Sequence, residues 1–504
     1  MPYAISAGHD ATAQAAATIL DAGGNAADAA IAALATSWIA EPCMSGAAGG
    51  GFANIRTAKG KSFLLDFFVQ TPLQKRPLEQ VEFLPIEVNF GDTTEVFYAG
   101  QGSIGVPGCI AGIFAMHRRF GTIPMPVLLE PAIQAAREGI AINNFQHEDF
   151  ELLESILKLD ERGRELFFNN GTIKGVGEMI KMPYFADMLD FLGREGERAF
   201  YEGEIAQLMV KDQTRFDHGG FLTRQDFVQY EVLERTPLQF PYRNKQIITN
   251  PLPSTGGAII TLILKALETV PPAVLHTKAY LLQLFEQLEQ VAQYGNRPAD
   301  LQRGLQSILS FNSPLSADRY TPKRGATTHL NIIDKDKNAI AITVSLGEGA
   351  GYFVEGTDMQ MNNMLGELAL LPDGIHSWIP NQRLSSMMAP TIVLNEQQRA
   401  EIVIGSGGAG RIPSAIAQVL RYLITYQLPL REAIQAARVH LHDRHFNVEY
   451  GFGAELSDNL PDCKLTNWKQ QSLFFGGAHT ILVKDGHYEA VGDQRRDGVA
   501  IVKV

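Results

Sequence analysis

The sequence predicts an α+β fold in which strands and helices lie in separate blocks of the chain. The first 40 residues are rich in alanine and carry two helix caps. Residues 105–294 mostly show the apolar spacing of helices, whereas the β-branched alternation of hairpins begins at Ala326. Blocks of this kind favour α+β layers over a doubly wound sheet.

Two helices are expected at the start of the chain. Asp10 can cap the first helix, which runs over about Ala11–Ala22 and ends at a glycine pair. Asn25 can cap a second helix that continues through Ala40. So many alanines predict helices that pack closely against other elements.

The remaining elements follow from periodicity and from breaker residues. Helical spacing predicts helices that include Pro131–Glu138, a stretch from about Ala258, Tyr280–Tyr294, Ile412–Gln427 and Leu430–Val439. Alternation and turn residues predict strands at Phe52–Arg56, Ser62–Phe68, a pair between Arg235 and Ile248, Thr327–Asp334, Ala339–Leu346, His479–Lys484, His487–Val491 and Val499–Val504. No composition shift marks a domain boundary.

Composition and charge exclude several classes of protein. The 504 residues are 45% hydrophobic and 19% charged, so the chain can bury a large core and is not disordered. A net charge of −12 argues against a general binder of nucleic acid or anionic membranes. The three cysteines and twelve histidines show no metal-type spacing. With no signal-peptide pattern and no membrane-length apolar run, we expect a cytoplasmic protein without a metal or organic cofactor.

The segment that begins at Ala326-Thr327 carries the most chemistry. A threonine at the start of a hairpin is ordinarily a strand residue. If the bond before Thr327 is cut, however, the new α-amine lies beside the hydroxyl and can take its proton. Such a nucleophile needs oxyanion donors, and a glycine cluster at Gly405–Gly410 precedes a predicted helix whose backbone N–H groups suit an anion. The other glycine cluster, Gly46–Gly51, lacks the features of a phosphate loop and indicates close backbone packing instead.

Several short stretches, in this order, make the chain resemble the gamma-glutamyltranspeptidases (glutathione hydrolases) of the N-terminal-nucleophile hydrolase superfamily. They are Gly8-His9, Gly23–Ala30, Glu41-Pro42, Ser45–Phe52, Gly105–Gly108, Arg235–Pro237, Pro253–Gly257, Thr327–His329, Leu384–Met387 and Gly492–Arg496. Each stretch is weak alone, but their joint order covers nearly the whole chain.

The resemblance implies a four-layer αββα sandwich and self-cleavage between Ala326 and Thr327. Residues 1–326 would form a large fragment and residues 327–504 a small one, intertwined as a heterodimer in one globular unit. Carried over by position, Thr327 is the nucleophile and Ser345 supplies a supporting hydroxyl. Gly408 and Ala409 would be the oxyanion pair, through their main-chain N–H groups.

The resemblance also implies a recognition shell for the substrate, part of which differs here. Three residues keep polar groups, namely Ser385 and Ser386 for an α-carboxylate and Glu367 for an α-amino group. Three others depart from the family pattern, namely Phe68 in place of an arginine, Gly347 in place of an asparagine and Met364 in place of a glutamine. Losing a charge-assisted contact of this kind costs roughly 2–5 kcal/mol. The residues therefore favour a less charged acyl group than glutamyl.

Three functions remain open on the sequence alone. The chain could be a self-processing gamma-glutamyl transferase or glutathione hydrolase, or an acylase or amidase that uses Thr327 on an uncharged acyl group. It could also be an unprocessed, non-catalytic binding homologue. The segment Leu368–Arg383 matches a short lid or an ordinary surface loop, and the Arg495-Arg496-Asp497 run is expected to form structural salt bridges.

Overall fold

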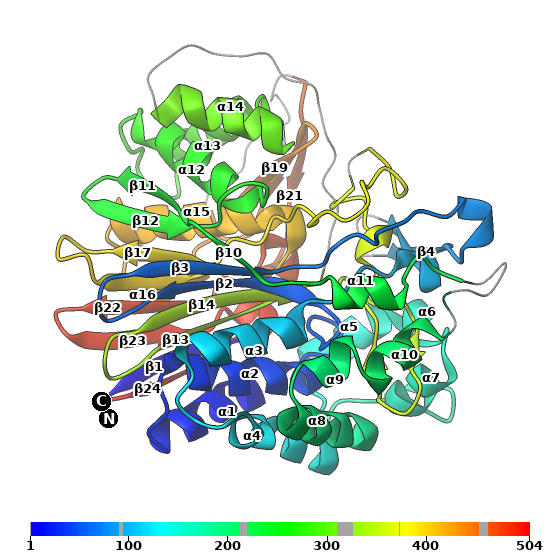
Figure 1. The fold of residues 1–504 in the computed structure, drawn as a ribbon. Coiled ribbons are helices and arrows are strands. Elements are labelled where there is room, and N and C mark those ends of the chain that lie inside the picture. The colour runs from blue at the N-terminus through cyan, green and yellow to red at the C-terminus, as the bar shows by residue number, and fades with distance from the viewer. Residues whose placement is uncertain are drawn as a thin grey trace.

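The computed structural model describes residues 2–89, 94–211, 213, 219–295, 297–309, 326–371, 373–452 and 462–504. The fold is α+β, as the sequence predicts, and two antiparallel sheets form its centre (Figure 1). Helices from the first half of the chain lie below the sheets in this view, and α12 to α15 lie above them.

The first sheet interleaves segments from both ends of the chain. Its strand order is β10 (Leu233–Arg235), β3 (Ser62–Phe67), β2 (Gly50–Arg56), β14 (Ala339–Ser345), β13 (Thr328–Ile333), β1 (Tyr3–Ala7) and β24 (Val499–Lys503). The expected hairpin of β13 and β14 therefore lies between β2 and β1, and every residue of both strands is buried. In this register Thr328 lies opposite Val344, and Ser345 lies opposite Gly50.

The second sheet packs against the first through apolar side chains. Its order is β11 (Leu238–Tyr242), β12 (Lys245–Thr249), β17 (Thr391–Leu394), β18 (Ala400–Ile404), β22 (Thr480–Lys484) and β23 (His487–Val491). Ala4 and Ile333 of the first sheet form one buried cluster with Ile248, Ile392 and Val403 of the second. This apolar contact between the sheets explains why β13 and β14 are buried on both faces.

The helices α1 (Asp10–Asp21), α2 (Ala26–Ala40) and α3 (Cys109–Phe120) pack on the first sheet. The helix α4 (Met125–Glu138) packs on α2, and α8 (Pro183–Glu195) packs on α4. All residues of α2 are buried, and Asn25 forms a capping box with Asp28. The expected cap of α1 is wrong by one residue, because His9 rather than Asp10 accepts the hydrogen bond from the Ala11 N–H.

A second group of helices packs with the second sheet around another apolar core. These are α12 (Gly256–Glu268), α13 (Lys278–Ala292), α14 (Pro298–Leu309), α15 (Ile412–Ile424) and α16 (Leu430–Gln435). The helix α16 is shorter than predicted because the backbone leaves the helical region at Ala436, where ψ is 140°, and strand β19 (Val439–His442) follows.

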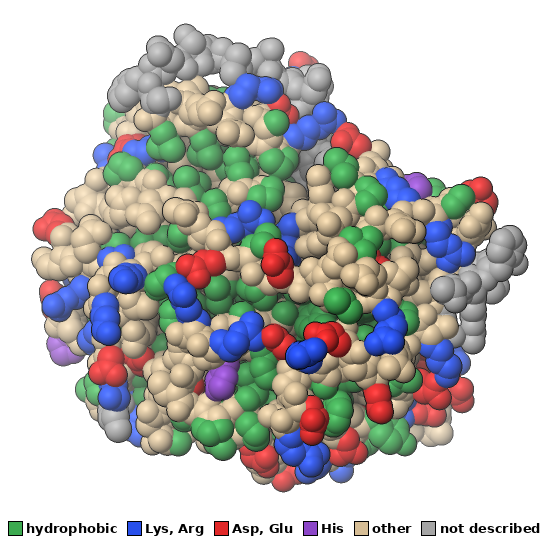
Figure 2. All heavy atoms as spheres, in the orientation of Figure 1, with side chains coloured by type: hydrophobic (Ala, Val, Ile, Leu, Met, Phe, Trp, Pro, Cys, Tyr) green, Lys and Arg blue, Asp and Glu red, His purple; other side chains and the backbone are tan. Residues whose placement is uncertain are grey.

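Short elements complete the described chain. They are α5 (Asn144–Leu152), α6 (Glu154–Leu157), α7 (Glu161–Phe167), α9 (Arg198–Tyr201), α10 (Glu204–Val210), α11 (Arg224–Val228), β4 (Leu84–Asn89), β5 (Thr94–Ala99), β6 (Ile140–Ala141), β7 (Phe168–Asn169), β8 (Thr172–Ile173), β9 (Met179–Ile180), β15 (Phe353–Val354), β16 (Met359–Gln360), β20 (His445–Val448) and β21 (Lys464–Asn467). On the face in Figure 2, charged side chains of both signs are interspersed. Among the described residues, no helix has the length and apolarity that a membrane span requires.

Candidate active site

The predicted nucleophile lies at the entrance to the central strand pair of the first sheet. Thr327 directly precedes β13 and is only 5% exposed. Its carbonyl oxygen accepts a hydrogen bond from Nη1 of Arg496 at 3.2 Å. Within the described part of the chain, the Thr327 hydroxyl makes no hydrogen bond, so no neighbouring acceptor occupies it. The loop expected before it, Tyr320–Gly325, lies outside the described residues.

The peptide group before Thr327 is held at both of its polar ends. The Ser345 hydroxyl donates a hydrogen bond to the carbonyl oxygen of Ala326, and the Gly347 N–H donates to Ser345 Oγ at 2.9 Å. The Ala326 N–H donates to Oε1 of Glu348 at 3.3 Å. A donor on this carbonyl polarises it and would stabilise an oxyanion formed there. The structure thus brings Ala326, Thr327 and Ser345 together, as the sequence predicts for a cleavage site.

The second glycine cluster approaches Thr327 too closely for any side chain. A Cβ on Gly407 would lie 2.2 Å from the Thr327 carbonyl oxygen. Gly408 and Ala409 follow with φ of +111° and +44°, in the left-handed region that an alanine rarely adopts. A Cβ on Gly408 would lie 3.5 Å from Nη2 of Arg496, the guanidinium that also holds Thr327. The two predicted oxyanion residues therefore lie beside the nucleophile, just before α15.

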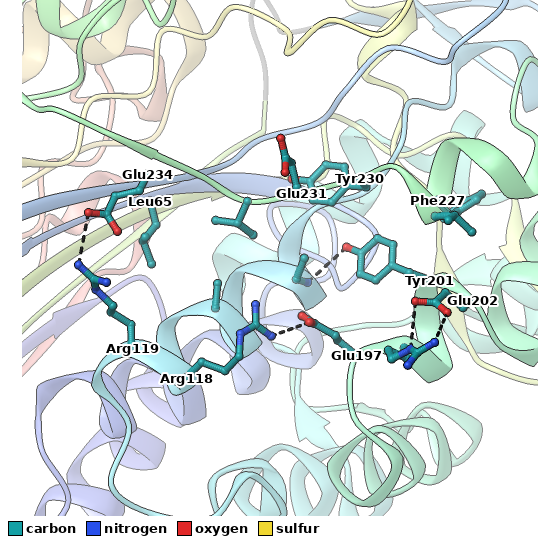
Figure 3. A pocket seen from close by; sticks show the side chains of 15 residues that line it. Leu65, Arg118, Arg119, Glu197, Tyr201, Glu202, Phe227, Tyr230, Glu231 and Glu234 are labelled. Atoms are coloured by element: carbon teal, nitrogen blue, oxygen red, sulfur yellow. Dashed lines mark hydrogen bonds and ion pairs between the residues drawn. The ribbon is translucent and has the colours of Figure 1, made fainter.

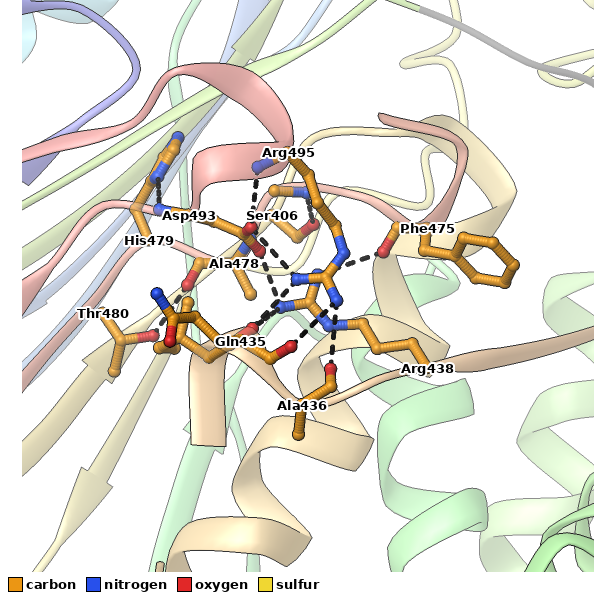
Figure 4. Close-up of polar contacts among 12 residues, drawn as sticks. Ser406, Gln435, Ala436, Arg438, Phe475, Ala478, His479, Thr480, Asp493 and Arg495 are labelled. Atoms are coloured by element: carbon orange, nitrogen blue, oxygen red, sulfur yellow. Dashed lines mark hydrogen bonds and ion pairs between the residues drawn. The ribbon is translucent and has the colours of Figure 1, made fainter. Parts of the chain in front are cut away.

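A buried ion-pair cluster fastens this glycine loop to the C-terminal strands (Figure 4). Asp493 pairs with Arg438 at 2.6 Å and with Arg495 at 3.2 Å, and it accepts a hydrogen bond from the Ala478 N–H. Burial alone would raise the pKa of Asp493, but the two arginines and the backbone donors outweigh it and hold the pKa well below its usual range. Ser406 Oγ then accepts from the Gly477 N–H at 3.0 Å, which ties the loop to this cluster.

The two adjacent arginines near the C-terminus have different roles. Arg495 forms buried ion pairs with Glu449 and Asp493, as expected for a structural residue. The expectation is wrong for Arg496, which forms no salt bridge within 4.0 Å among the described residues and instead contacts the Thr327 carbonyl. The sequence alone gave no signal that separates the two, because they are neighbours with identical side chains.

A buried glutamate that the sequence analysis did not single out supports Thr328. Oε1 of Glu41 accepts a hydrogen bond from the Thr328 hydroxyl at 2.6 Å, and Oε2 accepts from Thr12 at 3.3 Å. Burial raises the pKa of Glu41 to about 7, although these hydrogen bonds and the charge of Arg496 oppose the shift. Arg496 thus holds the carbonyl of Thr327, and Glu41 holds the hydroxyl of Thr328.

The expected substrate shell divides into two parts, and one part lies close to the Ser345 hydroxyl. Glu367 is 5% exposed, and its Oε1 has no hydrogen-bond partner among the described residues. Burial raises the pKa of this carboxyl to about 8. A Cβ on Gly347, which has φ of +70°, would lie 2.5 Å from Oε1 of Glu367 and 2.1 Å from Oδ1 of Asn363. Asn363 and Glu367 together therefore fill the space that a side chain at position 347 would need.

The other part of the expected shell is engaged in protein contacts. The ring of Phe68 is buried and stacks on Phe52 with centroids 5.5 Å apart, in the same apolar core as Met364. The hydroxyl of Ser385 donates to the carbonyl of residue 253 at 2.7 Å. Ser386 Oγ accepts from the backbone N–H of residue 388 at 3.1 Å. Phe68 and Met364 thus lie in the second apolar core, and Ser385 and Ser386 bond to the backbone.

The cation beside Phe68 is held by several protein oxygens. Arg383 Nη1 donates to the Phe68 carbonyl and to the Tyr230 hydroxyl, the latter at 2.5 Å, and Nη2 donates to the carbonyl of Glu231 at 2.5 Å. Its Nε lies 3.7 Å from Oδ1 of Asp66. This guanidinium fixes the end of β3, and its Nε, which makes no hydrogen bond among the described residues, faces the carboxylate of Asp66.

The described part of the expected lid packs against the protein. Trp378 is 3% exposed, meets Phe221 edge-on at 5.1 Å, and carries the Lys75 ammonium 4.7 Å from its ring centroid. This segment of Leu368–Arg383 is therefore anchored by an aromatic side chain rather than lying as a free surface loop.

A separate surface cavity of about 410 Å³ opens between α3, α9 and α11 (Figure 3). Arginines and glutamates on its rim pair with each other, as in Arg118–Glu197 and Arg198–Glu202. Its described lining residues do not include Thr327 or the neighbours named above. The described residues also contain no cluster of three or more His, Cys, Asp or Glu side chains that could hold a metal ion.

Comparisons of the sequence and of the structure with known proteins point to one family. The sequence profile of the family described as gamma-glutamyltranspeptidase matches residues 12–302 and 274–503. A glutathione hydrolase proenzyme of Escherichia coli (strain K12) is 28% identical over 533 residues, which cover 96% of this chain and 89% of the relative. Acylase ACY 1 proenzyme of Pseudomonas sp. (strain SE83) is also 28% identical, over 459 residues that cover 86% of this chain and 81% of the relative. The crystal structure of cephalosporin acylase from Bacillus halodurans shares the fold, with a TM-score of 0.79 at 22% identity over 99% of this chain and 95% of that one.

Proposed function

Because this chain belongs to the gamma-glutamyltranspeptidase family of N-terminal-nucleophile hydrolases, we propose that it is a proenzyme that cuts itself before Thr327. The mature protein then acts as an N-terminal-threonine amidohydrolase or acyltransferase. The observation that supports this most is the Ser345 hydroxyl on the Ala326 carbonyl, beside a Thr327 hydroxyl that makes no hydrogen bond with the described residues.

Self-cleavage would proceed by transfer of the acyl group from nitrogen to oxygen. Oγ of Thr327 attacks the carbonyl carbon of Ala326, the bond from that carbon to Thr327 N breaks, and the hydroxyl proton ends on the freed amine. Ser345 stabilises the oxyanion during the attack. Water then hydrolyses the ester and leaves a carboxylate on Ala326. In turnover, the new amine takes the Thr327 hydroxyl proton, and the N–H groups of Gly408 and Ala409 stabilise the oxyanion.

The two fragments would stay together after cleavage because they share one sheet. Strands β13, β14 and β24 of fragment 327–504 alternate with β1 and β2 of fragment 1–326. We assign the order of helices, first sheet, second sheet and helices to the αββα sandwich of N-terminal-nucleophile hydrolases. Separation into free fragments would leave unpaired strand edges on both, so the heterodimer is the expected mature form.

We also propose that the acyl donor lacks the carboxylate of a glutamyl group. Phe68 stands where the family carries an arginine, and the neighbouring Arg383 is committed to the carbonyls of Phe68 and Glu231 and to the Tyr230 hydroxyl. The buried carboxyl of Glu367, whose pKa burial raises to about 8, offers no counter-charge for a second carboxylate. A gamma-glutamyl donor remains the second candidate, supported by the relative described as a glutathione hydrolase proenzyme.

A steady-state comparison tests the proposed donor. The purified wild-type protein, with its state of cleavage checked by intact mass, is given gamma-glutamyl and propionyl p-nitroanilides at equal concentrations. We expect a higher kcat/KM for the propionyl substrate, because it places no carboxylate beside Phe68 and Glu367. A strong preference for the gamma-glutamyl substrate would show that another cation binds the carboxylate.

A further inference from the structure

Turnover needs the α-amine that self-cleavage frees on Thr327 in its neutral form, because only that form can take the proton of the hydroxyl. A free α-amine ordinarily has a pKa of about 7.7–8.0, so most of it would be ammonium at neutral pH. Thr327 is only 5% exposed, and in the uncut chain no described residue accepts a hydrogen bond from its N–H. Burial without an acceptor disfavours a charged ammonium at this position.

A buried guanidinium places a positive charge beside the same residue. Nη1 of Arg496 donates to the Thr327 carbonyl oxygen at 3.2 Å, and Arg496 is only 5% exposed. Because that carbonyl belongs to the residue that carries the amine, covalent geometry puts the amine nitrogen within about 7 Å of Nη1. A like charge at this range, away from solvent, disfavours the ammonium further.

The titratable groups around Arg496 compensate its charge only in part. The charge of Arg496 acts on Glu41, at the end of α2, and on Asp149 of α5. Burial raises the pKa of each carboxyl to about 7, so near neutral pH each carries a proton part of the time. Asp493 is ionised, but it pairs with two other arginines. His479 is neutral, because burial lowers its pKa to about 4.

An opposing charge lies on the other side of the cleavage site. Oε1 of Glu348, which is 2% exposed, accepts the hydrogen bond from the Ala326 N–H at 3.3 Å. As a carboxylate, Glu348 favours the ammonium form of a nearby amine. The next carboxyl, that of Glu367, is mostly protonated at pH 7, because burial raises its pKa to about 8. Removal of Glu348 and removal of Arg496 should therefore move the amine in opposite directions.

We propose that Arg496 is a positioning residue of turnover that keeps the α-amine of Thr327 neutral, so that the amine acts as general base at and below neutral pH. The inference rests on the proposed function above and deepens it. Arg496 acts through Thr327 and does not touch the substrate. When the pH falls and Glu41 and Asp149 take up protons, the charge of Arg496 is compensated less, and the ammonium is disfavoured further.

The experiment is the pH dependence of kcat/KM between pH 5.5 and 9, which reports the ionisation of the essential base in the free enzyme. The substrate is propionyl p-nitroanilide, or gamma-glutamyl p-nitroanilide if only that is turned over. The proteins are wild type, Arg496→Gln, Arg496→Lys, Glu348→Gln and Glu41→Gln, each checked for cleavage by intact mass. Arg399→Gln removes one positive charge at an exposed position and is the matched control.

We expect the acid limb of wild type to have its midpoint below pH 7, and that of Arg496→Gln to lie roughly one unit higher. The loss of kcat/KM in Arg496→Gln should therefore be nearly tenfold larger at pH 5.5 than at pH 9. Arg496→Lys keeps the charge and should keep the midpoint, as should Arg399→Gln. Glu348→Gln should lower the midpoint, and Glu41→Gln should retain the acid limb.

Several results would decide against the inference. A loss in Arg496→Gln that is equal at all pH values shows a merely structural residue, while the proposed amidase stands. An acid limb that disappears in Glu41→Gln assigns the ionisation to Glu41 instead. If Arg496→Gln stays uncut, the wild-type midpoint decides, because a value at or above the ordinary 7.7 or so overturns the inference and a lower value shared by Arg496→Lys supports it. A wild type that is uncut and turns over neither anilide overturns the inference together with the proposed function.

Discussion

Replacing Ser345 with alanine removes the hydrogen-bond donor on the carbonyl that self-cleavage attacks. In the uncut chain the Ser345 hydroxyl donates to Ala326 O, and the Gly347 N–H at 2.9 Å keeps this hydroxyl in place. Loss of one oxyanion donor typically costs about 2.7–4 kcal/mol, a factor of about 10² to 10³ in rate. We therefore expect Ser345→Ala to slow cleavage by roughly that factor.

The assay is a time course of cleavage after cell-free translation, stopped in denaturant and resolved on a gel. Ser345→Thr is the matched control, because it keeps a hydroxyl at the same atom and should cleave within about tenfold of wild type. The thermal unfolding of Ser345→Ala shows whether the variant is folded. If folded Ser345→Ala is cut within threefold of the wild-type rate, the hydroxyl does not stabilise the oxyanion and our mechanism is wrong.

Three further predictions follow from the buried groups, and each is measured in a Thr327→Ala background so that the chain stays in one piece. Burial raises the pKa of Glu41 to about 7, so the folded protein keeps a proton on this carboxyl that the unfolded chain loses near pH 4.5. As the pH rises from 4 to 8, the unfolding free energy of the parent should therefore fall by roughly 3 kcal/mol relative to that of Glu41→Gln. A constant difference between the two proteins would refute this. Asp493→Asn should lower the unfolding free energy by roughly 3–5 kcal/mol at pH 7, because it leaves Arg438 and Arg495 buried without their shared carboxylate. The depressed pKa of Asp493 adds stability above about pH 4 that is lost as the pH falls, so the effect of Asp493→Asn should shrink in acid; an equal effect at pH 7 and pH 2 would contradict the ion pair. Phe68→Arg should lower the melting temperature, because a charge replaces a buried stacked ring. The same substitution in the protein that keeps Thr327 should raise gamma-glutamyl turnover relative to propionyl turnover. An unchanged ratio of the two turnovers in a folded protein would exclude residue 68 from carboxylate recognition.

Local patterns were sufficient for most of the secondary structure. The Asn25 cap, the glycine breakers and the β-branched hairpin at Thr327–Leu346 each depend on neighbours within a few residues, and the structure has elements at all of these places. The cap of the first helix shows the limit of this reasoning. The sequence predicted Asp10, but His9 is the cap, because two adjacent polar residues can accept a hydrogen bond from the first backbone N–H groups.

The surroundings of Thr327 could be predicted only in part. The glycine cluster was found from its own pattern before a predicted helix, whereas Ser345 was found through the resemblance to a family. Glu41 and Arg496, however, reach Thr328 and Thr327 across 287 and 169 residues of sequence, and no local spacing connects such pairs. Their positions depend on the strand order of the first sheet, which periodicity does not specify.

Self-cleavage before Thr327 is the central claim, and intact mass spectrometry of the purified wild-type protein and of Thr327→Ala tests it most directly. We predict two wild-type species whose masses match residues 1–326 and 327–504, and a single full-length species for Thr327→Ala, because alanine has no hydroxyl to attack Ala326. A wild-type protein that stays full-length after long incubation, or a Thr327→Ala protein that is cut at the same bond, would contradict the account.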